Sequence, residues 1–228
     1  MCFNASASLG AFSIGALFLV AMVQRKMYSL SILYATIIVM QLAEYYAHNS
    51  LLSNNKYMNR NISLVILAIL FLQPVIWSLY NAVFHIKKTS YKNIIYLTVA
   101  LFSLFITYFY SVLKKSNALR IDYLKKSCSS SSSICRLDWS FFKESIPLSI
   151  VFLFFYFFLF VFSNFAVTTK KNMRLIYAFG ALPILLALSI VFMIFVDKIH
   201  NMSTIISGFG SIWCISSVLI GPIALLHG

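Results

Sequence analysis

The chain has 228 residues, of which 61% are hydrophobic and 10% are charged. Water-soluble domains contain about 45–50% apolar and about 25% charged residues, so this composition excludes a soluble globular protein and indicates an integral membrane protein. The formal net charge of +13 does not indicate nucleic-acid binding, because the Lys and Arg residues form short clusters between apolar segments. We interpret these clusters as membrane-orientation signals and contacts for anionic lipid head groups.

The apolar segments predict membrane-spanning helices. A bilayer core about 30 Å thick requires about 20 helical residues, and each of seven segments is long enough. No segment shows the alternating pattern of a barrel strand. We therefore predict an all-α integral membrane fold, a bundle of seven transmembrane helices in one domain covering residues 1–228. The expected spans are residues 6–23, 28–49, 62–84, 93–113, 145–167, 174–196 and 203–226.

The basic residues also predict the orientation. Eight of them lie in the first, third and fifth connections, against three at the amino end and in the second and sixth connections. Because cytosolic connections are enriched in Lys and Arg, we expect the amino end outside and the carboxyl end in the cytosol. The fourth connection, residues 114–144, is then a long outer loop. It carries seven more basic residues and would reverse the sum if it were counted whole.

Features of the predicted outer segments agree with this orientation. The Asn-X-Ser/Thr sequons begin at Asn4, Asn61 and Asn201, all in segments assigned outside, where glycosylation takes place. Cys128 and Cys135 flank a run of serines in the fourth connection. A disulfide between them would require an oxidising compartment. Two unpaired thiols beside a flexible serine linker are the alternative interpretation.

The second span carries the best candidate for a functional site. Gln41, Glu44, Tyr45 and His48 are spaced at i, i+3, i+4 and i+7, which places them on one face of a helix. A charged carboxylate is costly among lipid chains, so we expect Glu44 to point into the bundle and to form a polar pocket. The structural alternative is a neutral Glu44 that hydrogen-bonds Gln73 or a hydroxyl of the seventh span and holds helices in register.

The third span contains Gln73 and Pro74 near its middle. Pro74 removes one helical hydrogen bond and predicts a kink. Gln73 would either donate its amide to the carbonyl that Pro74 frees or face Glu44 in the second span. Small residues predict close helix packing elsewhere. They recur at Ala7, Ala11 and Gly15 and throughout the seventh span, including Gly221.

An enzymatic interpretation requires a metal site. His48, Asp197 and His200 are expected near the outer ends of their spans. Such a set could bind zinc, whose bound water would hydrolyse a lipid amide or ester. The chain contains no His-x3-His and no Gly-x-Ser-x-Gly motif, so we expect a non-enzymatic protein with no cofactor. The seventh span contains no Lys for a retinal Schiff base, which excludes a rhodopsin-type pigment.

Three short motifs carry a resemblance to a known family. The opening Met1–Ser8 (Met-Cys-Phe-Asn-Ala-Ser-Ala-Ser), Gln41-x-x-Glu44 and the segment Ser211–Cys214 (Ser-Ile-Trp-Cys) occur in the expected order and spans. They resemble motifs of a family of uncharacterised multi-pass membrane proteins of bacteria and large DNA viruses that open Met-Cys-Phe-Ser-Ala-x-Ala-Ser. The resemblance implies a bundle of about seven helices and no particular activity. It also implies that Cys2, Glu44, Trp213 and Cys214 line one site.

These observations favour a multi-pass membrane protein with a polar pocket around Glu44 that binds or moves a small solute, an ion or a proton. The metal-dependent lipid hydrolase is one alternative. A structural or interaction protein of a viral or host membrane is the other. The expected partners are the lipid bilayer and an unidentified small solute, ion or lipid, with neither nucleic acid nor retinal.

Overall fold

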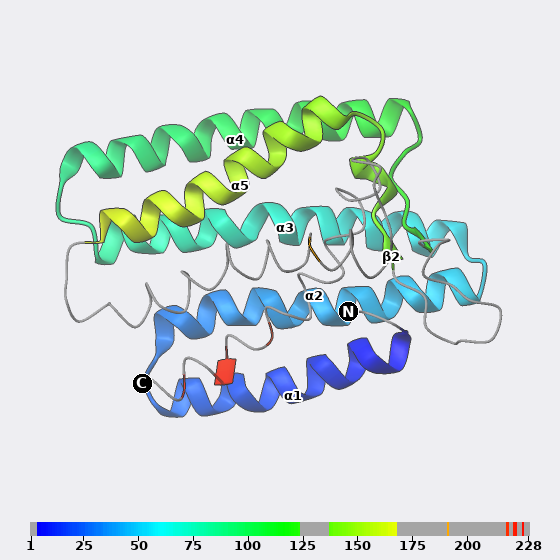
Figure 1. Ribbon diagram of the computed structural model, residues 1–228, viewed down its shortest axis with the longest axis horizontal. Helices are drawn as coiled ribbons and strands as arrows, with labels where there is room; N and C mark the ends of the chain where they lie inside the picture. The colour runs from blue at the N-terminus through cyan, green and yellow to red at the C-terminus, as the bar shows by residue number, and fades with distance from the viewer. Residues whose placement is uncertain are drawn as a thin grey trace.

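The computed structural model describes residues 4–123 and 137–167, together with the single residues 191, 218, 221, 222 and 225. Within these ranges five long helices lie side by side (Figure 1). Each of the five is long and apolar enough to cross a membrane. This confirms the mostly helical fold; the predicted sixth and seventh spans lie almost entirely outside the described residues. The helices are α1 (Ala5–Gln24), α2 (Tyr28–Leu52), α3 (Lys56–Phe84), α4 (Thr89–Lys115) and α5 (Ile146–Ala166).

Two helices begin earlier than the apolar segments predicted. α3 begins at Lys56 instead of residue 62, and α4 begins at Thr89 instead of residue 93. The Asn55 side chain caps α3 by accepting a hydrogen bond from the Met58 backbone N–H at 2.9 Å. Capping residues determine where a helix begins, whereas hydropathy marks where the chain enters the hydrocarbon, so the polar first turns of α3 were assigned to a connection.

α3 is central to the described part of the bundle. It contacts α2, α4 and α5, and α2 lies between α3 and α1. α1 packs closely on α2 at Gly15, where a Cβ atom would lie 3.0 Å from Cγ1 of Ile38. The small-residue packing predicted for Gly15 is therefore confirmed. Ala7 and Ala11 are only half-buried, and Ser8, two helical turns before Gly15, is buried instead.

The long fourth connection folds over one end of the bundle. α4 continues to Lys115, and β1 (Asp122–Tyr123) then pairs antiparallel with β2 (Leu137–Asp138), with Tyr123 opposite Leu137. A short 3-10 helix, η2 (Ser140–Phe142), leads into α5. We call residues 116–123 and 137–145 the end cover, and the end of the bundle beneath them the covered end. The buried hydrophobic residues of the end cover are Ala118, Leu119, Ile121, Leu137, Trp139, Phe141 and Phe142.

Trp139 lies near the end of this connection, where a tryptophan is expected to anchor at a membrane interface, but it is only 1% exposed. Its ring lies 6.2 Å from that of Phe141 and 6.1 Å from that of Phe142, centroid to centroid. The aromatic side chains of the end cover extend the core of the bundle, because the Phe142 ring also lies 6.5 Å from that of Phe109 in α4 and 5.4 Å from that of Phe152 in α5. Cys128 and Cys135 fall between the two strands and lie outside the described residues.

Asn59 of α3 fastens the end cover to the bundle. Its Nδ2 donates to the Ile121 carbonyl at 2.9 Å, and its Oδ1 accepts from the Ile121 backbone N–H at 3.0 Å. Through these two hydrogen bonds the Asn59 side chain pairs with the Ile121 backbone as a neighbouring strand would. Asn59 is 7% exposed, so the pairing satisfies backbone groups of Ile121 that would otherwise be buried without partners.

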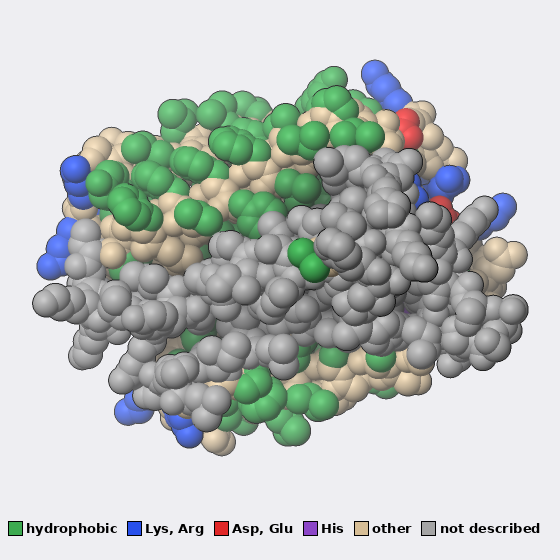
Figure 2. Space-filling view, viewed as in Figure 1, with side chains coloured by type: hydrophobic (Ala, Val, Ile, Leu, Met, Phe, Trp, Pro, Cys, Tyr) green, Lys and Arg blue, Asp and Glu red, His purple; other side chains and the backbone are tan. Residues whose placement is uncertain are grey.

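The sides of the bundle are apolar and its ends are charged. Figure 2 shows hydrophobic side chains over the described parts of the visible face, with Lys and Arg near the ends. In the described ranges, the end opposite the cover has Arg25, Lys26, Lys87, Lys88 and Lys92 and no Asp or Glu. The covered end has the acidic residues Asp122, Asp138 and Glu144 in addition to its basic residues. Because the positive-inside rule counts Lys and Arg and gives acids little weight, this asymmetry does not test the orientation, which stays a prediction.

Candidate functional site

The helix whose most apolar window is the least hydrophobic of the five described helices, α2, is also the most buried. In α2, 61% of the most apolar 18-residue window lies inside the molecule, against 17% for α1 and for α4. Gln41 and Glu44 have no exposed surface, and His48 is 1% exposed. The expected burial of Glu44 is therefore confirmed. Tyr45 is only half-buried and lies at the edge of this face, with its ring 5.3 Å from that of Tyr46.

The polar face of α2 runs up to the end cover. The His48 ring lies 5.8 Å from the ring of Tyr123 in β1. Burial raises the pKa of Tyr123, so its phenol stays neutral over the physiological range. Two residues after His48, the Ser50 hydroxyl donates to the Ala47 carbonyl at 2.7 Å and accepts from Asn59 Nδ2 at 3.3 Å. Tyr123 and Asn59 therefore close the covered end of the polar face.

Gln73 connects three helices in the middle of the bundle. Its Nε2 donates to the Thr36 carbonyl of α2 at 3.4 Å, and its Oε1 accepts from the Tyr156 hydroxyl of α5 at 2.7 Å. Both sequence-based interpretations of Gln73 are therefore wrong, since its amide bonds neither the carbonyl that Pro74 frees nor Glu44. α3 continues through Pro74 from Lys56 to Phe84. The acceptor for Nε2 comes from the neighbouring helix instead of from the same one.

Two further polar contacts join α3 to α5. Trp77 Nε1 donates to Asn164 Oδ1 at 3.1 Å, and the Ser78 hydroxyl donates to the Leu159 carbonyl at 3.0 Å. Sequence reasoning missed this interface, because it assigned no polar role to Tyr156 or Asn164. The signal was present, since Tyr156 and Asn164 carry polar groups in a helix that is otherwise almost wholly apolar.

Asn81 lies one turn beyond Trp77 and is completely buried. Neither Nδ2 nor Oδ1 of its amide has a hydrogen-bond partner among the residues that the structure describes. His85, which follows the last residue of α3, is half-buried. Its Nε2 also has no hydrogen-bond partner among those residues. Burial lowers the pKa of His85, so its imidazole stays neutral more readily than an exposed one. Unsatisfied polar atoms therefore lie toward the end opposite the cover, as they also do in the end cover at Asp138 Oδ1 and Trp139 Nε1.

The remaining sequence-predicted residues are placed as follows. Asn4 caps α1, with its Oδ1 accepting from the Ala7 backbone N–H at 2.8 Å, and Asn61 is exposed within α3. In the described ranges no group of three His, Cys, Asp or Glu side chains is placed to hold a metal ion. Of the predicted metal set, only His48 falls in those ranges. Asp197, His200, Asn201, Trp213 and Cys214 lie outside them.

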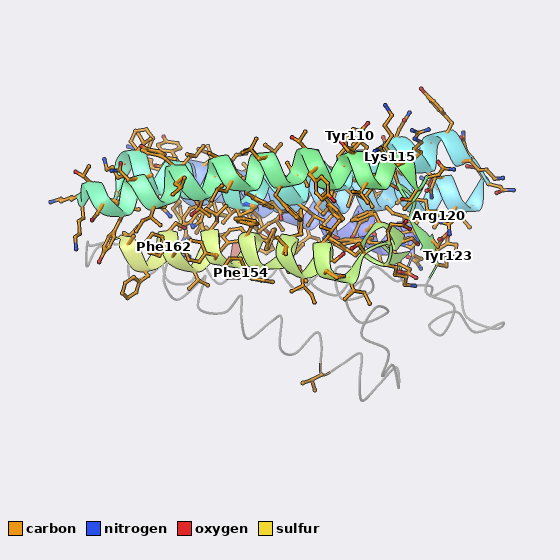
Figure 3. All side chains as sticks on the ribbon, turned by 90° about the horizontal axis from the view of Figure 1, so that it is seen from above. Tyr110, Lys115, Arg120, Tyr123, Phe154 and Phe162 are labelled. Atoms are coloured by element: carbon orange, nitrogen blue, oxygen red, sulfur yellow. The ribbon has the colours of Figure 1, made fainter. Side chains whose placement is uncertain are left out.

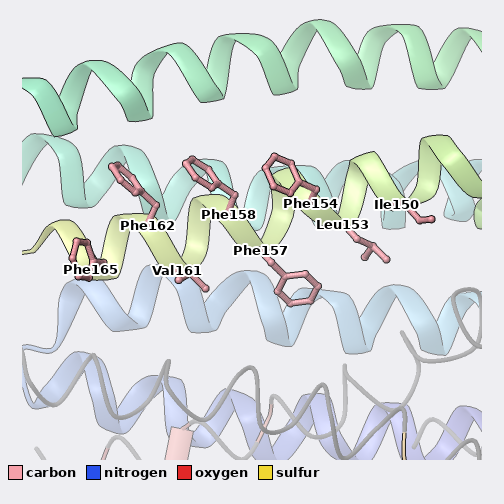
Figure 4. Close-up of a pocket in the computed structure, with 8 residues that line it drawn as sticks. All are labelled: Ile150, Leu153, Phe154, Phe157, Phe158, Val161, Phe162 and Phe165. Carbon is pink, nitrogen blue, oxygen red and sulfur yellow. The ribbon is translucent and has the colours of Figure 1, made fainter.

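A separate apolar groove runs along α5 (Figure 4). It has a volume of about 580 Å³ and is lined only by apolar side chains of this helix, including Phe154, Phe158 and Phe162. Figure 3 shows Phe154 and Phe162 well away from the end where Arg120 and Tyr123 lie. The groove offers no group that could bind an ion or catalyse a reaction. Its chemistry matches that of an acyl chain, as expected for a helix side in a bilayer.

Comparisons with models of known protein families, with curated proteins and with solved structures find no match for this chain. The resemblance of its three short motifs to a family of multi-pass membrane proteins therefore stays a prediction. The geometry of α2 and α3 is what remains to indicate a function.

Proposed function

We propose that this multi-pass membrane protein binds a proton or a small cation at Glu44, within the buried polar face of α2. The observation that carries this proposal is the complete burial of Glu44 between Gln41 and His48, in a helix long and apolar enough to cross a bilayer. Ionisable side chains inside such helices are costly and commonly mark the paths or binding sites of ions.

A carboxyl group suits this role better than the neutral groups around it. It takes up and releases a proton, and its oxygens are preferred ligands of small hard cations. Gln41 lies three residues before Glu44 and His48 four residues after it, so both are close enough along the helix to orient the carboxyl group. If the requirement were only helix packing, an amide or a hydroxyl would serve at lower cost.

The site is nearer to the covered end. Along α2 the buried side chains toward the opposite end are mainly apolar, among them Leu30, Leu33 and Ile37. The polar face begins at Gln41 and ends beneath Tyr123 of the end cover. We therefore infer that the ligand enters from the covered end, which is the outer side in the predicted orientation.

The proposal is tested by ligand-dependent stability of the purified protein. Thermal unfolding is measured at a series of pH values and with Na⁺, K⁺, Mg²⁺ or Ca²⁺ at constant ionic strength. A ligand at 100 times its Kd stabilises the folded state by about 2.7 kcal/mol. We expect Glu44→Gln to lose the response and Glu44→Asp, which keeps the carboxyl group, to retain it with altered affinity.

Glu144→Gln is the matched control, because Glu144 is an exposed carboxylate at the covered end. It should respond as the unaltered protein does. If Glu44→Gln folds and responds to every ligand in the same way as Glu144→Gln, Glu44 binds no ion. The structural interpretation, in which its side chain only holds helices together, would then replace the proposal.

A further inference from the structure

Buried polar side chains follow the bundle from one end to the other. α2 and α3 run in opposite directions, and two contacts fix their register: Ser50 with Asn59 and Thr36 with Gln73. In both pairs the residue numbers add to 109, so an α2 residue and an α3 residue lie at the same height along the bundle when their numbers add to this sum. Since each helical residue rises about 1.5 Å, Gln41 lies about 7 Å along the bundle axis from Gln73.

The polar groups are spaced at about one per helical turn of about 5.4 Å. Starting beneath the end cover, α2 supplies three of them, and α3 continues the series through the middle of the bundle to the opposite end. The members are His48, Glu44 and Gln41 on α2, then Gln73, Trp77, Asn81 and His85 on α3. Neither helix alone carries a polar series over its whole length. Because of the register between the two helices, the series on α2 is continued by the series on α3.

The α3 half of the series has hydrogen-bonding capacity that the described residues leave unused. The Asn81 amide offers two donors and one acceptor and is completely buried, and neither Nδ2 nor Oδ1 has a partner among those residues. Nε2 of His85 is in the same condition. Buried groups of this kind are normally satisfied, and bound water is the common partner because it both donates and accepts.

We propose that Asn81 and His85 hold ordered water, which links Glu44 through Gln73 to the end opposite the cover and makes the bundle a proton route. A proton arriving from the covered end forms an O–H bond with the Glu44 carboxylate. It then leaves to a water molecule on the Asn81 side, which regenerates the carboxylate. The amides of Gln73 and Asn81 position water and take up no proton. This inference rests on the proposed function and extends it from binding to transport.

The experiment uses the full chain in liposomes that contain a pH-sensitive dye, with a K⁺ diffusion potential imposed by valinomycin. We expect proton uptake well above that of empty liposomes, and uptake at the background level for Glu44→Gln. Asn81→Leu keeps the size of the side chain and removes its polar atoms. It should lower the rate by about tenfold or more while leaving the Glu44-dependent stabilisation intact.

Two further variants sharpen the test. Asn61→Leu makes the same change at an exposed position of α3 and should move protons at the unaltered rate. Asn81→Ser keeps a hydroxyl that can hold water and should retain a rate between those of the unaltered protein and Asn81→Leu. It also serves if the leucine variant does not fold.

The outcomes distinguish a failure of the proton route from a failure of the proposed binding at Glu44. If Asn81→Leu moves protons as fast as Asn61→Leu, the route through Asn81 is wrong while binding at Glu44 stands. Proton uptake no faster than in empty liposomes, or a flux that follows only Na⁺ or K⁺ gradients, would also overturn the proton route. The proposed function fails only if Glu44→Gln leaves ligand-dependent stability unchanged.

Discussion

α2 and α5 are both long enough to cross a bilayer, but their side chains are arranged in opposite ways. α2 buries Gln41, Glu44 and His48 on one face, whereas α5 exposes Phe154 to 62% and Phe165 to 76%. In a water-soluble protein the more apolar helix would be the better buried one. Lipid accepts apolar side chains and rejects polar ones, so here the less apolar helix marks the interior of the bundle.

The largest expected effect comes from removing a tryptophan on the buried side of this comparison. Trp77 is 1% exposed and donates to Asn164, so Trp77→Ala should destabilise the fold by about 3–5 kcal/mol. Phe165→Ala removes an aromatic ring from the outward side of α5 and should cost less than about 1 kcal/mol. Reversible unfolding in mixed detergent micelles measures both. Equal losses would contradict the assignment of the two sides.

The second prediction concerns how closely residues near the carboxyl end pack on α2. A Cβ atom at Gly221 would lie 2.5 Å from Cζ of the buried Tyr34, whose hydroxyl donates to the Val218 carbonyl at 2.8 Å. Gly221→Ala should therefore destabilise the protein by about 1–3 kcal/mol through overpacking. Gly10→Ala is the control, because no atom lies within 4 Å of its added Cβ. It should be neutral or stabilise α1 by up to about 1 kcal/mol.

The third prediction concerns the hydrogen bond that links the compared helices through α3. Gln73 contacts Thr36 of α2 and Tyr156 of α5. A double-mutant cycle with Gln73→Leu and Tyr156→Phe should give a coupling free energy of about 0.6 kcal/mol and at most about 1.7 kcal/mol, the mean and the maximum found for such bonds in membranes. Unfolding in micelles provides the four free energies. Strictly additive single effects would mean that the 2.7 Å contact contributes nothing.

The smallest effect is a pH dependence at His85. Because burial lowers its pKa, the folded protein holds the imidazole neutral while the unfolded chain binds a proton below about pH 6.5. Stability should be unaffected by this group at higher pH and fall as the pH drops through that value. Thermal unfolding midpoints should therefore decline less with acidification in His85→Gln. Parallel curves for the two proteins would contradict this assignment.

The positions of the helices could be predicted from the sequence, but their ends could not. Five of the predicted spans match α1 to α5, because a long apolar segment has few alternatives in a bilayer. The early start of α3 was missed, since Lys56, Asn59 and Arg60 look like loop residues and yet continue the helix beyond the hydrocarbon. The two-residue strands of the end cover are too short to leave any periodic pattern.

The candidate site was predictable on α2 and unpredictable elsewhere. Helical spacing alone places Gln41, Glu44 and His48 on one face, and all three are buried. The partners of Gln73 depend on the register between separate helices, which spacing within one helix does not contain. The burial of Trp139 could not be predicted for the same reason, because the strand pair beside it forms between distant residues.

The most direct test of the central claim is infrared difference spectroscopy of the purified protein in lipid, with pH changes and with added cations. We predict a carboxyl-group signal that changes when the ligand binds, persists in Glu144→Gln and is absent in Glu44→Gln. A signal that is the same in a folded Glu44→Gln protein, or a Glu44 carboxyl that responds to neither protons nor cations, would contradict the account.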